Sequence, residues 1–390
     1  MERILVIEYW QLGDVVIALP FLTALRRMFP RARLTAVVGR AGEMLLRGDK
    51  VVDEIIRVDV PWAVHFRRWR KYNPFSPSLW SALAVFWRLR RKGFDLGFAG
   101  RMDIRDHFLL WLSRARRRVG YGEAGGSFLL TDNVPCPDRL VHRSRLWLRL
   151  LREPPVGPQR PAPLLEVGDA DSGRASEFLG SRGIDEYTLL VGIHSGARIA
   201  TRRWGDERFA AVAERILEQF DVKILWFKEN QAARPGRAAG HRYIEVVLPM
   251  REFMAVLSRC SLLVCNDSGP MHVAAALGVP VVAIFGPQEP AVFAPVGDGH
   301  SVVYKKDFEC RPCADYCLYD EPYCLREVTV DDVHKAAAAK LREILGKGPH
   351  RPGPSRARTG DLFSRPEQPI RPWVEPNHRR TPIANWKRAS

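Results

Sequence analysis

The sequence has no uninterrupted apolar run near the roughly 20 residues that a helix needs to span a bilayer. Its first seven residues read as a short strand and lack the architecture of a secretory signal peptide. From these two absences we expect a cytoplasmic protein, with peripheral contact with a membrane surface left open.

Two other signatures are absent. The 7 cysteines are an odd number, and in a chain without a secretion signal this argues against a disulfide framework. No Gly-x-Gly-x-x-Gly fingerprint follows the first predicted strand, which counts against NAD or FAD as a bound cofactor.

Acidic residues are scarce relative to basic ones, and the formal net charge of the 390 residues is +16. This balance favours an anionic partner, which could be a nucleic acid, a membrane surface or a phosphorylated substrate. Residues 346–390 contain ten Lys or Arg against three Asp or Glu, many prolines and no apolar periodicity. We expect a disordered basic tail there. Because the folded part is then less basic and carries no recognised nucleic-acid motif, a nucleic-acid partner is not favoured.

Short apolar runs alternate with helical patterns along most of the chain. Strands are expected at 3–8, 33–38, 55–58, 95–98, 188–193, 222–227, 261–265 and 281–285. Helices are expected after the first strand, from Val15 to Phe29, and near 206–220 and 251–259. This alternation predicts an α/β protein with doubly wound parallel sheets. A Pro- and Gly-rich stretch at 153–170 reads as a linker, so we place the two domains at 1–165 and 166–345.

The segment 265–272, Cys-Asn-Asp-Ser-Gly-Pro-Met-His, joins a buried strand to an Ala-rich helix. Such a loop brings small polar residues and free N–H groups to the carboxyl end of a parallel sheet, where phosphate binds. Asp267, Ser268, Gly269 and His272 are the candidate ligand residues. The alternatives are that Asp267 accepts turn N–H groups and that His272 is a satisfied core histidine.

A second candidate loop follows the strand that begins the second half of the chain. His194, Ser195, Gly196 and Ala197 precede a basic cluster that contains Arg198, Thr201, Arg202 and Arg203. Arginine donates in a fork to phosphate oxygens, so this cluster suits a diphosphate. The alternative is a solvated basic loop.

Gly13 and Asp14 stand between the first strand and the first helix. Asp14 fits a helix N-cap, because its carboxylate accepts free N–H groups at that position. It also fits a general base at the carboxyl edge of the sheet. Both interpretations stay open at this point.

A cysteine cluster and a basic–aromatic segment each have more than one interpretation. Cys310, Cys313, Cys317 and Cys324 could hold zinc as four thiolates, but their spacing also suits unligated cysteines or a labile disulfide. Arg, Lys and aromatic residues interleave at 65–92, and more arginines follow at 114–118. This composition suits contact with anionic lipid, base stacking in a nucleic acid, or an ordinary amphipathic helix with a solvated basic face.

Three stretches together resemble glycosyltransferase family 9, the ADP-heptose:lipopolysaccharide heptosyltransferases. They are ILVIEYWQLGDVVIALPFLTALRRMFP near the N-terminus, IHSGARIATRRWGDERFAAVAERI, and LLVCNDSGPMHVAAALGVPVVAIFGPQEP. The resemblance covers about residues 1–340. It implies a GT-B fold, with two Rossmann-like domains that face each other across a cleft. The acceptor then binds the N-terminal domain, and the nucleotide-sugar donor binds the C-terminal one.

The resemblance also implies an activity. It is an inverting, metal-independent transfer, first of all of a heptose from ADP-heptose, to a lipopolysaccharide-core or other lipid-linked acceptor, with no required cofactor. The protein would then work at the inner face of the inner membrane, which residues 65–118 could contact. A GT-B nucleotide-sugar 2-epimerase and a non-catalytic anion- or nucleic-acid-binding protein are the alternatives.

Site roles carry over position by position. Asp14 becomes the candidate base and Arg202 the contact to the donor phosphates, where the family has Lys. The other residues assigned to substrate binding are Gly13, Ser195, Gly196, Thr201, Asp267, Ser268, Gly269, Met271 and His272. Glu229 would bind the ribose and Met250 the base. The chain departs from the family at Tyr9-Trp10-Gln11, where small residues are usual, and matches it poorly at 65–118.

Overall fold

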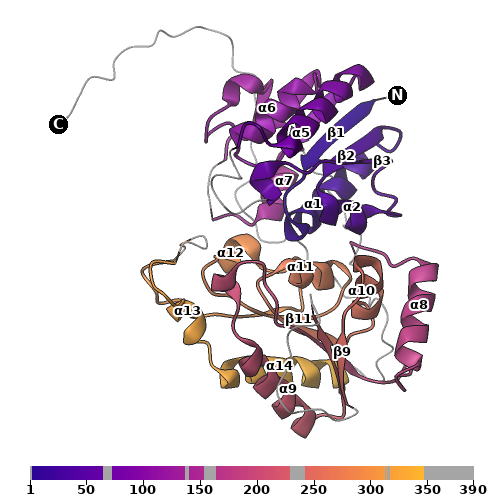
Figure 1. Cartoon of the computed structure of the whole chain (residues 1–390), viewed down its shortest axis with the longest axis vertical. Helices are drawn as coiled ribbons and strands as arrows, with labels where there is room; N and C mark the ends of the chain where they lie inside the picture. Colours follow the sequence, from indigo (N-terminus) through magenta and orange to yellow (C-terminus); the bar gives the residue numbers. More distant parts are fainter. Residues whose placement is uncertain are drawn as a thin grey trace, which may run out of the picture.

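The computed structural model describes residues 2–64, 73–136, 140–152, 164–228, 242–311, 313 and 317–346. Most of the predicted linker, the basic tail after residue 346 and the basic–aromatic segment 65–72 therefore lie outside the described residues. Within the described part, the fold consists of two sheets that each carry helices on both faces (Figure 1).

The first sheet has six parallel strands in the order β3-β2-β1-β4-β5-β6. Their bounds are β1 (Arg3–Glu8), β2 (Arg33–Val38), β3 (Glu54–Arg57), β4 (Leu96–Ala99), β5 (Arg117–Gly120) and β6 (Asp132–Asn133). The chain winds outward from β1 in one direction and then returns to β4 to wind in the other. The strand order therefore reverses between β1 and β4, which is where doubly wound sheets bind ligands.

The second sheet repeats this plan in the order β12-β11-β10-β7-β8-β9, again with all strands parallel. Its strands are β7 (Leu190–His194), β8 (Lys223–Phe227), β9 (Tyr243–Val246), β10 (Leu262–Asn266), β11 (Val281–Ile284) and β12 (Ser301–Val303). The reversal here lies between β7 and β10.

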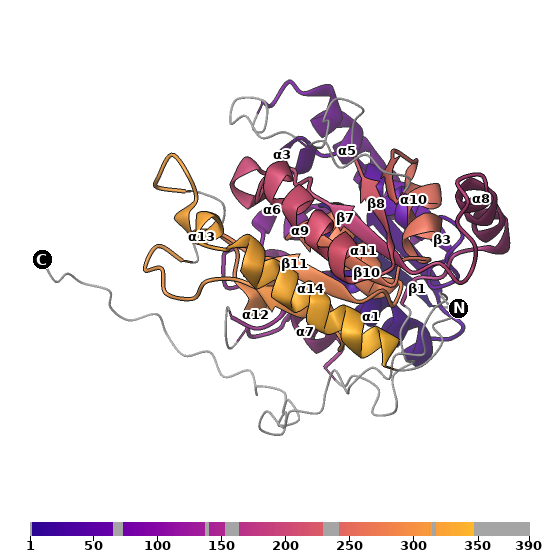
Figure 2. The same ribbon diagram turned by 90° about the horizontal axis from the view of Figure 1, so that it is seen from below.

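The helices divide between the two sheets. Those of the first are α1 (Leu12–Met28), α2 (Arg40–Leu46), α3 (Pro61–Val64), α5 (Pro77–Leu89), α6 (Ile104–Leu112) and α7 (Arg143–Arg149). Those of the second are α8 (Asp169–Gly180), α9 (Asp206–Gln219), α10 (Met250–Leu257), α11 (Gly269–Ala276), α12 (Pro290–Phe293), α13 (Tyr323–Arg326) and α14 (Val330–Leu345). The view in Figure 2 shows α9 and α14 side by side over the second sheet. No helix in the described part of the chain is long and apolar enough to cross a membrane.

The strands and helices predicted from apolar patterning are confirmed, and so is the doubly wound architecture. The prediction missed β5, β6, β9 and β12. These lie toward the sheet edges and have two to four residues, too few to show a periodicity. The predicted domain boundary near residue 165 stays a prediction. The N–H groups of Leu164 and Leu165 both donate to the carbonyl of Ala276, the last residue of α11, so these two residues already contact the second domain.

The two sheets meet through α1 and α11, which pack against each other (Figure 1). Buried residues of both helices, such as Val15 and Val273, belong to one hydrophobic cluster. The apolar core therefore continues from one domain into the other, and the loops at both strand reversals face the same space.

Replacing Leu263 in β10 tests how strongly this continuous core supports the fold. Its side chain is completely buried and packs against Gly192 of β7. Leu263→Ala is expected to lower the free energy of unfolding by roughly 2–5 kcal/mol, because it leaves a cavity between tightly packed strands. Urea unfolding followed by tryptophan fluorescence measures this. Leu318→Ala, at an exposed leucine, is the control and is expected to change little.

Candidate active site

A cavity of about 410 Å³ lies where the two strand reversals face each other. The first domain contributes Trp10, Gly13, Asp14 and Arg101 to its wall. The second contributes Arg198, Arg202, Asp267, Ser268, Gly269 and His272. The structure thus brings the predicted carboxylate and most of the predicted phosphate-binding residues into one cavity.

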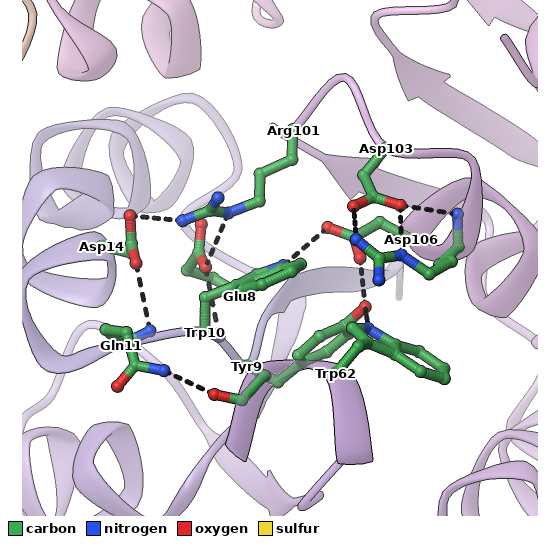
Figure 3. A network of polar contacts seen from close by, with 11 residues as sticks. Glu8, Tyr9, Trp10, Gln11, Asp14, Trp62, Arg101, Asp103 and Asp106 are labelled. Atoms are coloured by element: carbon green, nitrogen blue, oxygen red, sulfur yellow. Dashed lines mark hydrogen bonds and ion pairs between the residues drawn. The ribbon is translucent and has the colours of Figure 1, made fainter. Parts of the chain in front are cut away.

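Asp14 projects from the first turn of α1 at the end of β1 (Figure 3). One carboxylate oxygen, Oδ2, accepts the Gln11 backbone N–H at 3.1 Å. The other, Oδ1, lies 2.5 Å from the Arg101 guanidinium. Asp14 is therefore the third residue of the helix, and Gln11 holds the N-cap position instead. The N-cap interpretation of Asp14 is therefore wrong, although its carboxylate stabilises the helix start from the third position. Asp14 lines the cavity, and its role as a general base stays a prediction.

Charge around Asp14 decides its protonation. Burial raises its pKa, but the guanidinium groups of Arg101 and Arg143 outweigh this effect and leave the pKa below its ordinary value. Asp14 is thus ionised at neutral pH. The neighbouring Glu8, 3.8 Å from the Arg101 Nε, behaves in the opposite way, since burial raises its pKa to about 8. Arg101 therefore faces one carboxylate and one carboxylic acid at neutral pH.

An aromatic and acidic network holds the loop beside Asp14 (Figure 3). The Trp10 indole N–H donates to Asp106 at 3.1 Å, and the Tyr9 hydroxyl donates to the other oxygen of the same carboxylate. The Trp62 indole N–H donates to Tyr9 at 3.1 Å. The Arg101 guanidinium lies over the Trp10 ring, 4.4 Å from its centroid. Hydrogen bonds thus fix Tyr9 and Trp10, the residues expected to depart from the family, and the Trp10 ring orients the Arg101 guanidinium.

The opposite wall carries the predicted donor loops. Arg202, in the short 3-10 turn Ala200–Arg202, lies 3.1 Å from the buried Asp267 carboxylate at the end of β10. Ser268 occupies the N-cap position of α11, and Pro270 stands in the first turn. Pro270 has no N–H, and the Met271 N–H donates to the Ser268 carbonyl at 3.2 Å, which leaves the Gly269 N–H as the donor of this turn. The Gly269 N–H and Arg202 can both reach an anion in the cavity.

Asn266 joins these two loops. Its side-chain amide donates to the Ser195 carbonyl at 2.7 Å and accepts the Trp204 backbone N–H at 3.2 Å. Because Asn266 is completely buried at the end of β10, it fixes the loop after β7 against the loop after β10. The sequence analysis included Asn266 in the segment 265–272 but assigned it no role.

Gly13 and His272 pack closely against each other across the two domains. A Cβ atom on Gly13 would lie 2.8 Å from the His272 ring, and one on Gly269 would lie 3.0 Å from the Leu12 side chain. A side chain at Gly13 would therefore clash with the His272 ring, and one at Gly269 would push the Leu12 side chain aside. Burial, with His142 and Arg202 nearby, lowers the pKa of His272 to about 3. His272 is neutral at pH 7 and acts as a hydrogen-bonding group rather than a cation.

A second cavity, of about 260 Å³, adjoins the first, and Leu12 and Pro270 line both. Its wall is mostly apolar, with Met250, Phe227, Leu248 and Phe253 beside Lys228 and His194. Met250 was predicted to contact the nucleotide base, and it lies on this wall. Glu229, predicted to bind the ribose, lies outside the described residues.

Several predicted site residues do not reach the cavity wall. Ser195, Gly196 and Thr201 lie in the loop next to it, and Arg198 and Ile199 line the wall in their place. Met271 is completely buried in the core, because it points to the opposite side of α11 from the cavity.

The structure gives no support to the hypothesis that four cysteines hold a zinc ion. Among the described residues, which include Cys310, Cys313, Cys317 and Cys324, no group of three or more His, Cys, Asp or Glu is placed to hold a metal ion.

Sequence reasoning missed two basic residues of the first domain. Arg101 closely follows β4, one of the two strands between which the strand order reverses. A strand was expected at 95–98, so this position could have marked Arg101 as a site residue. Arg143 begins α7 and influences the pKa of Asp14, but no strand end marks it in the sequence. Only the packing of α7 against α1 brings it near.

Two Rossmann-like domains that face each other across a shared cavity are the architecture of the GT-B class of glycosyltransferases. The profile of glycosyltransferase family 9 (heptosyltransferase) matches residues 82–323. The chain belongs to this family.

Relatives agree with this assignment. Lipopolysaccharide heptosyltransferase 1 of Pseudomonas aeruginosa is 27% identical over 332 residues, which cover 80% of this chain and 86% of that protein. A family 9 glycosyl transferase from Veillonella parvula superposes with a TM-score of 0.68 at 24% identity, covering 88% of this chain and 97% of that one. The ADP-heptose lipopolysaccharide heptosyltransferase II of Escherichia coli superposes with a TM-score of 0.66 at 18% identity, covering 88% and 99%. The structural matches confirm the GT-B fold.

The Arg101–Asp14 ion pair is expected to set the pH dependence of activity. Arg101 is the strongest of the charges that lower the pKa of Asp14, so Arg101→Gln is expected to raise that pKa. An activity that needs the ionised carboxylate is lost as pH falls through its pKa. The acid limb of kcat/KM should therefore move to higher pH in the variant. A pH series of initial rates measures this, with Arg117→Gln, at the far end of the sheet, as the control. An acid limb that stays in place would show that Arg101 does not set the charge of Asp14.

Proposed function

We propose that this protein is an inverting heptosyltransferase that transfers heptose from ADP-heptose to an acceptor of the lipopolysaccharide core. Family membership and the names of its relatives support the chemistry. The observation that carries the proposal is the single cavity in which Asp14 faces Arg202 and the start of α11. One wall can take a proton, and the other can hold a diphosphate.

The reaction begins at the first domain. Asp14 accepts the proton of the acceptor hydroxyl while that oxygen attacks the anomeric carbon of the donor sugar. The bond from the anomeric carbon to the diphosphate breaks on the opposite side, so the configuration inverts. Asp14 suits this role because it is ionised and reaches the cavity, with 17% of its side chain exposed.

The second domain stabilises the leaving group. Negative charge develops on the diphosphate as the bond breaks, and Arg202 and the Gly269 N–H at the start of α11 are fixed in advance to receive it. These groups provide the charge stabilisation that a divalent cation provides in other enzymes, so we propose a transfer that needs no metal ion.

The nucleoside occupies the second cavity in this arrangement. Its apolar wall, with Met250 and Phe253, fits the flat face of a base, and Lys228 and His194 give it a polar side. Because this cavity shares Leu12 and Pro270 with the first, a nucleoside there and a diphosphate at α11 can belong to one ligand.

The alternatives have less support. A nucleotide-sugar 2-epimerase needs no acceptor, whereas the family whose profile matches is one of transferases. An anion- or nucleic-acid-binding protein without activity has no use for an ionised carboxylate opposite the phosphate site.

We further propose that the protein works on the cytoplasmic face of the inner membrane, where α5 and α6 contact anionic lipid. These neighbouring helices lie on the side of the first domain away from the second (Figure 1). Together with Phe75, two residues before α5, they expose the large apolar side chains Trp80, Trp87, Ile104, Phe108 and Trp111. Arg88, Arg90, Arg91 and Lys92 follow in the same region, and the Arg90 guanidinium lies 3.8 Å from the Trp87 ring centroid. Aromatic residues beside cations are typical of interfacial helices.

The base assignment predicts the behaviour of Asp14→Asn. The amide is nearly the same size but cannot accept the proton, so kcat should fall by at least about 10²-fold. The donor wall is unchanged, so the affinity for ADP should stay within about twofold. Transfer from ADP-heptose to heptose-free lipopolysaccharide measures the first, and calorimetric titration with ADP the second. A variant that keeps near-normal turnover would show that Asp14 is not the base.

The membrane proposal is tested by sedimentation with vesicles that contain phosphatidylglycerol. The protein is expected to bind them in a salt-sensitive manner and to bind neutral phosphatidylcholine vesicles much less. Replacing Trp80 and Trp87 by Ser should weaken binding by roughly tenfold or more, because two interfacial anchors are lost. Replacing the exposed Tyr187 of the second domain by Ser is the control. Equal binding to both kinds of vesicle, or none, would reject the proposal.

A further inference from the structure

Trp10 brings an aromatic ring to the first-domain wall of the cavity. The residue is half-buried and lines this wall together with Asp14 and Arg101. The Arg101 guanidinium lies 4.4 Å from the centroid of the Trp10 ring, and its Nη2 lies 2.5 Å from the Asp14 carboxylate (Figure 3). The indole is therefore separated from the Asp14 carboxylate by the thickness of one guanidinium group.

Two further contacts fix the indole in this place. Its N–H donates to Asp106 at 3.1 Å, and this carboxylate is almost completely buried and also accepts the Tyr9 hydroxyl. A second guanidinium, that of Arg105, lies 5.5 Å from the ring centroid. Swinging the indole out of the wall would take a donor from a buried carboxylate and would separate the ring from both guanidinium groups, which costs stability. Trp10 is thus a rigid part of the wall.

The same contacts leave the indole with little to offer an acceptor except its volume. Its N–H is already donated to Asp106, and the Arg101 guanidinium covers one face of the ring. A sugar in the cavity therefore gains no hydrogen bond from the indole and cannot stack on the covered face. Trp10 acts on the cavity as an inflexible group that occupies space beside Asp14.

The cavity is small for the groups that the proposed reaction brings into it. Its volume of about 410 Å³ lies toward the lower end of the range for ligand pockets, which is about 300–1,000 Å³. In the proposed reaction, the diphosphate and the sugar of the donor fill the part in front of Arg202. The space that remains beside Trp10 then suits the sugar unit that is attacked and little more.

We propose that Trp10 selects the acceptor by size: it admits a terminal sugar without a branch and excludes one from which a second sugar branches near the attacked hydroxyl. This inference rests on the proposed function and names the chemical class of its acceptor. A fixed group that clashes with the larger substrate gives such selectivity without any attractive contact to the smaller one. Trp10 is then a specificity-determining residue and takes no part in the bond changes.

The test compares two heptose-free lipopolysaccharides, one with a single core sugar and one in which a second sugar branches from the first. Wild type is expected to use the unbranched acceptor with a kcat/KM at least about 10-fold higher. Trp10→Ser should bring the two values to within about twofold of each other, because the branch then has space. The ratio of the two values is decisive, since a loss of support for Arg101 would lower both rates together.

Trp10→Phe is the matched control. A phenyl ring keeps a face for the Arg101 guanidinium and most of the bulk, but it lacks the N–H that bonds Asp106. Its rates should fall with both acceptors, while their ratio stays close to that of wild type. Trp10→Leu should give an intermediate ratio, and it takes the place of Trp10→Ser if the serine variant does not fold.

Three results would overturn the inference. One is a wild type that uses both acceptors equally or prefers the branched one. Another is a ratio that stays the same in Trp10→Ser. The third is a ratio that changes as much in Trp10→Phe as in Trp10→Ser, because the effect would then come from the lost hydrogen bond.

Binding measurements separate this inference from the proposed function. Calorimetric titration of the ADP-bound protein with the same two acceptors reports affinity without turnover. If the wild type transfers heptose to neither acceptor, the proposed function is rejected. Tighter binding of the unbranched acceptor that disappears in Trp10→Ser would still support selection by size, and equal affinities in the wild type would contradict it.

Discussion

The contact between the starts of α1 and α11 is the constraint on which the rest of the site depends. Gly13 lies against the His272 ring and Gly269 against Leu12, so the ends of two separate sheets come within van der Waals distance. The core runs through this contact without a break. As a result, a carboxylate from one domain and a helix start from the other line the same cavity, although neither domain alone forms it.

Charge is distributed unequally over the two walls. On the acceptor side, Arg101 keeps Asp14 ionised while burial keeps Glu8 protonated, so two neighbouring carboxyl groups differ in charge. Trp10, braced by Asp106, supports the guanidinium that produces this difference. On the wall of the second domain, His272 is neutral, and Arg202 lies 3.1 Å from Asp267. The aromatic loop at Tyr9-Trp10 is therefore part of the electrostatics of the site.

Much of this could be predicted from the sequence, and the physical reason is local. Strands buried on both faces give apolar runs, and a parallel sheet places the residues after those runs at one edge, so Asp14, Arg202 and Asp267 were found. Met271 and His272 show the limit, because adjacent residues of a helix point about 100° apart and the sequence does not say which one faces the ligand. Arg101 and Arg143 act on Asp14 from segments far along the chain. They come near Asp14 only after the loop before α6 and the helix α7 have packed beside α1. The spacing of residues in the sequence does not reveal this packing.

The sharing of Arg202 between Asp267 and the cavity has a consequence for turnover. A guanidinium that already faces a buried carboxylate 3.1 Å away offers less than a full charge to a diphosphate. The nucleoside diphosphate that remains after transfer is more negative than the donor was, and a strongly cationic wall would retain it. In the proposed reaction, a wall with Arg198, an Arg202 already paired with Asp267 and an uncharged imidazole would stabilise charge as it forms and still let the product go. The pairing would thus weaken product inhibition.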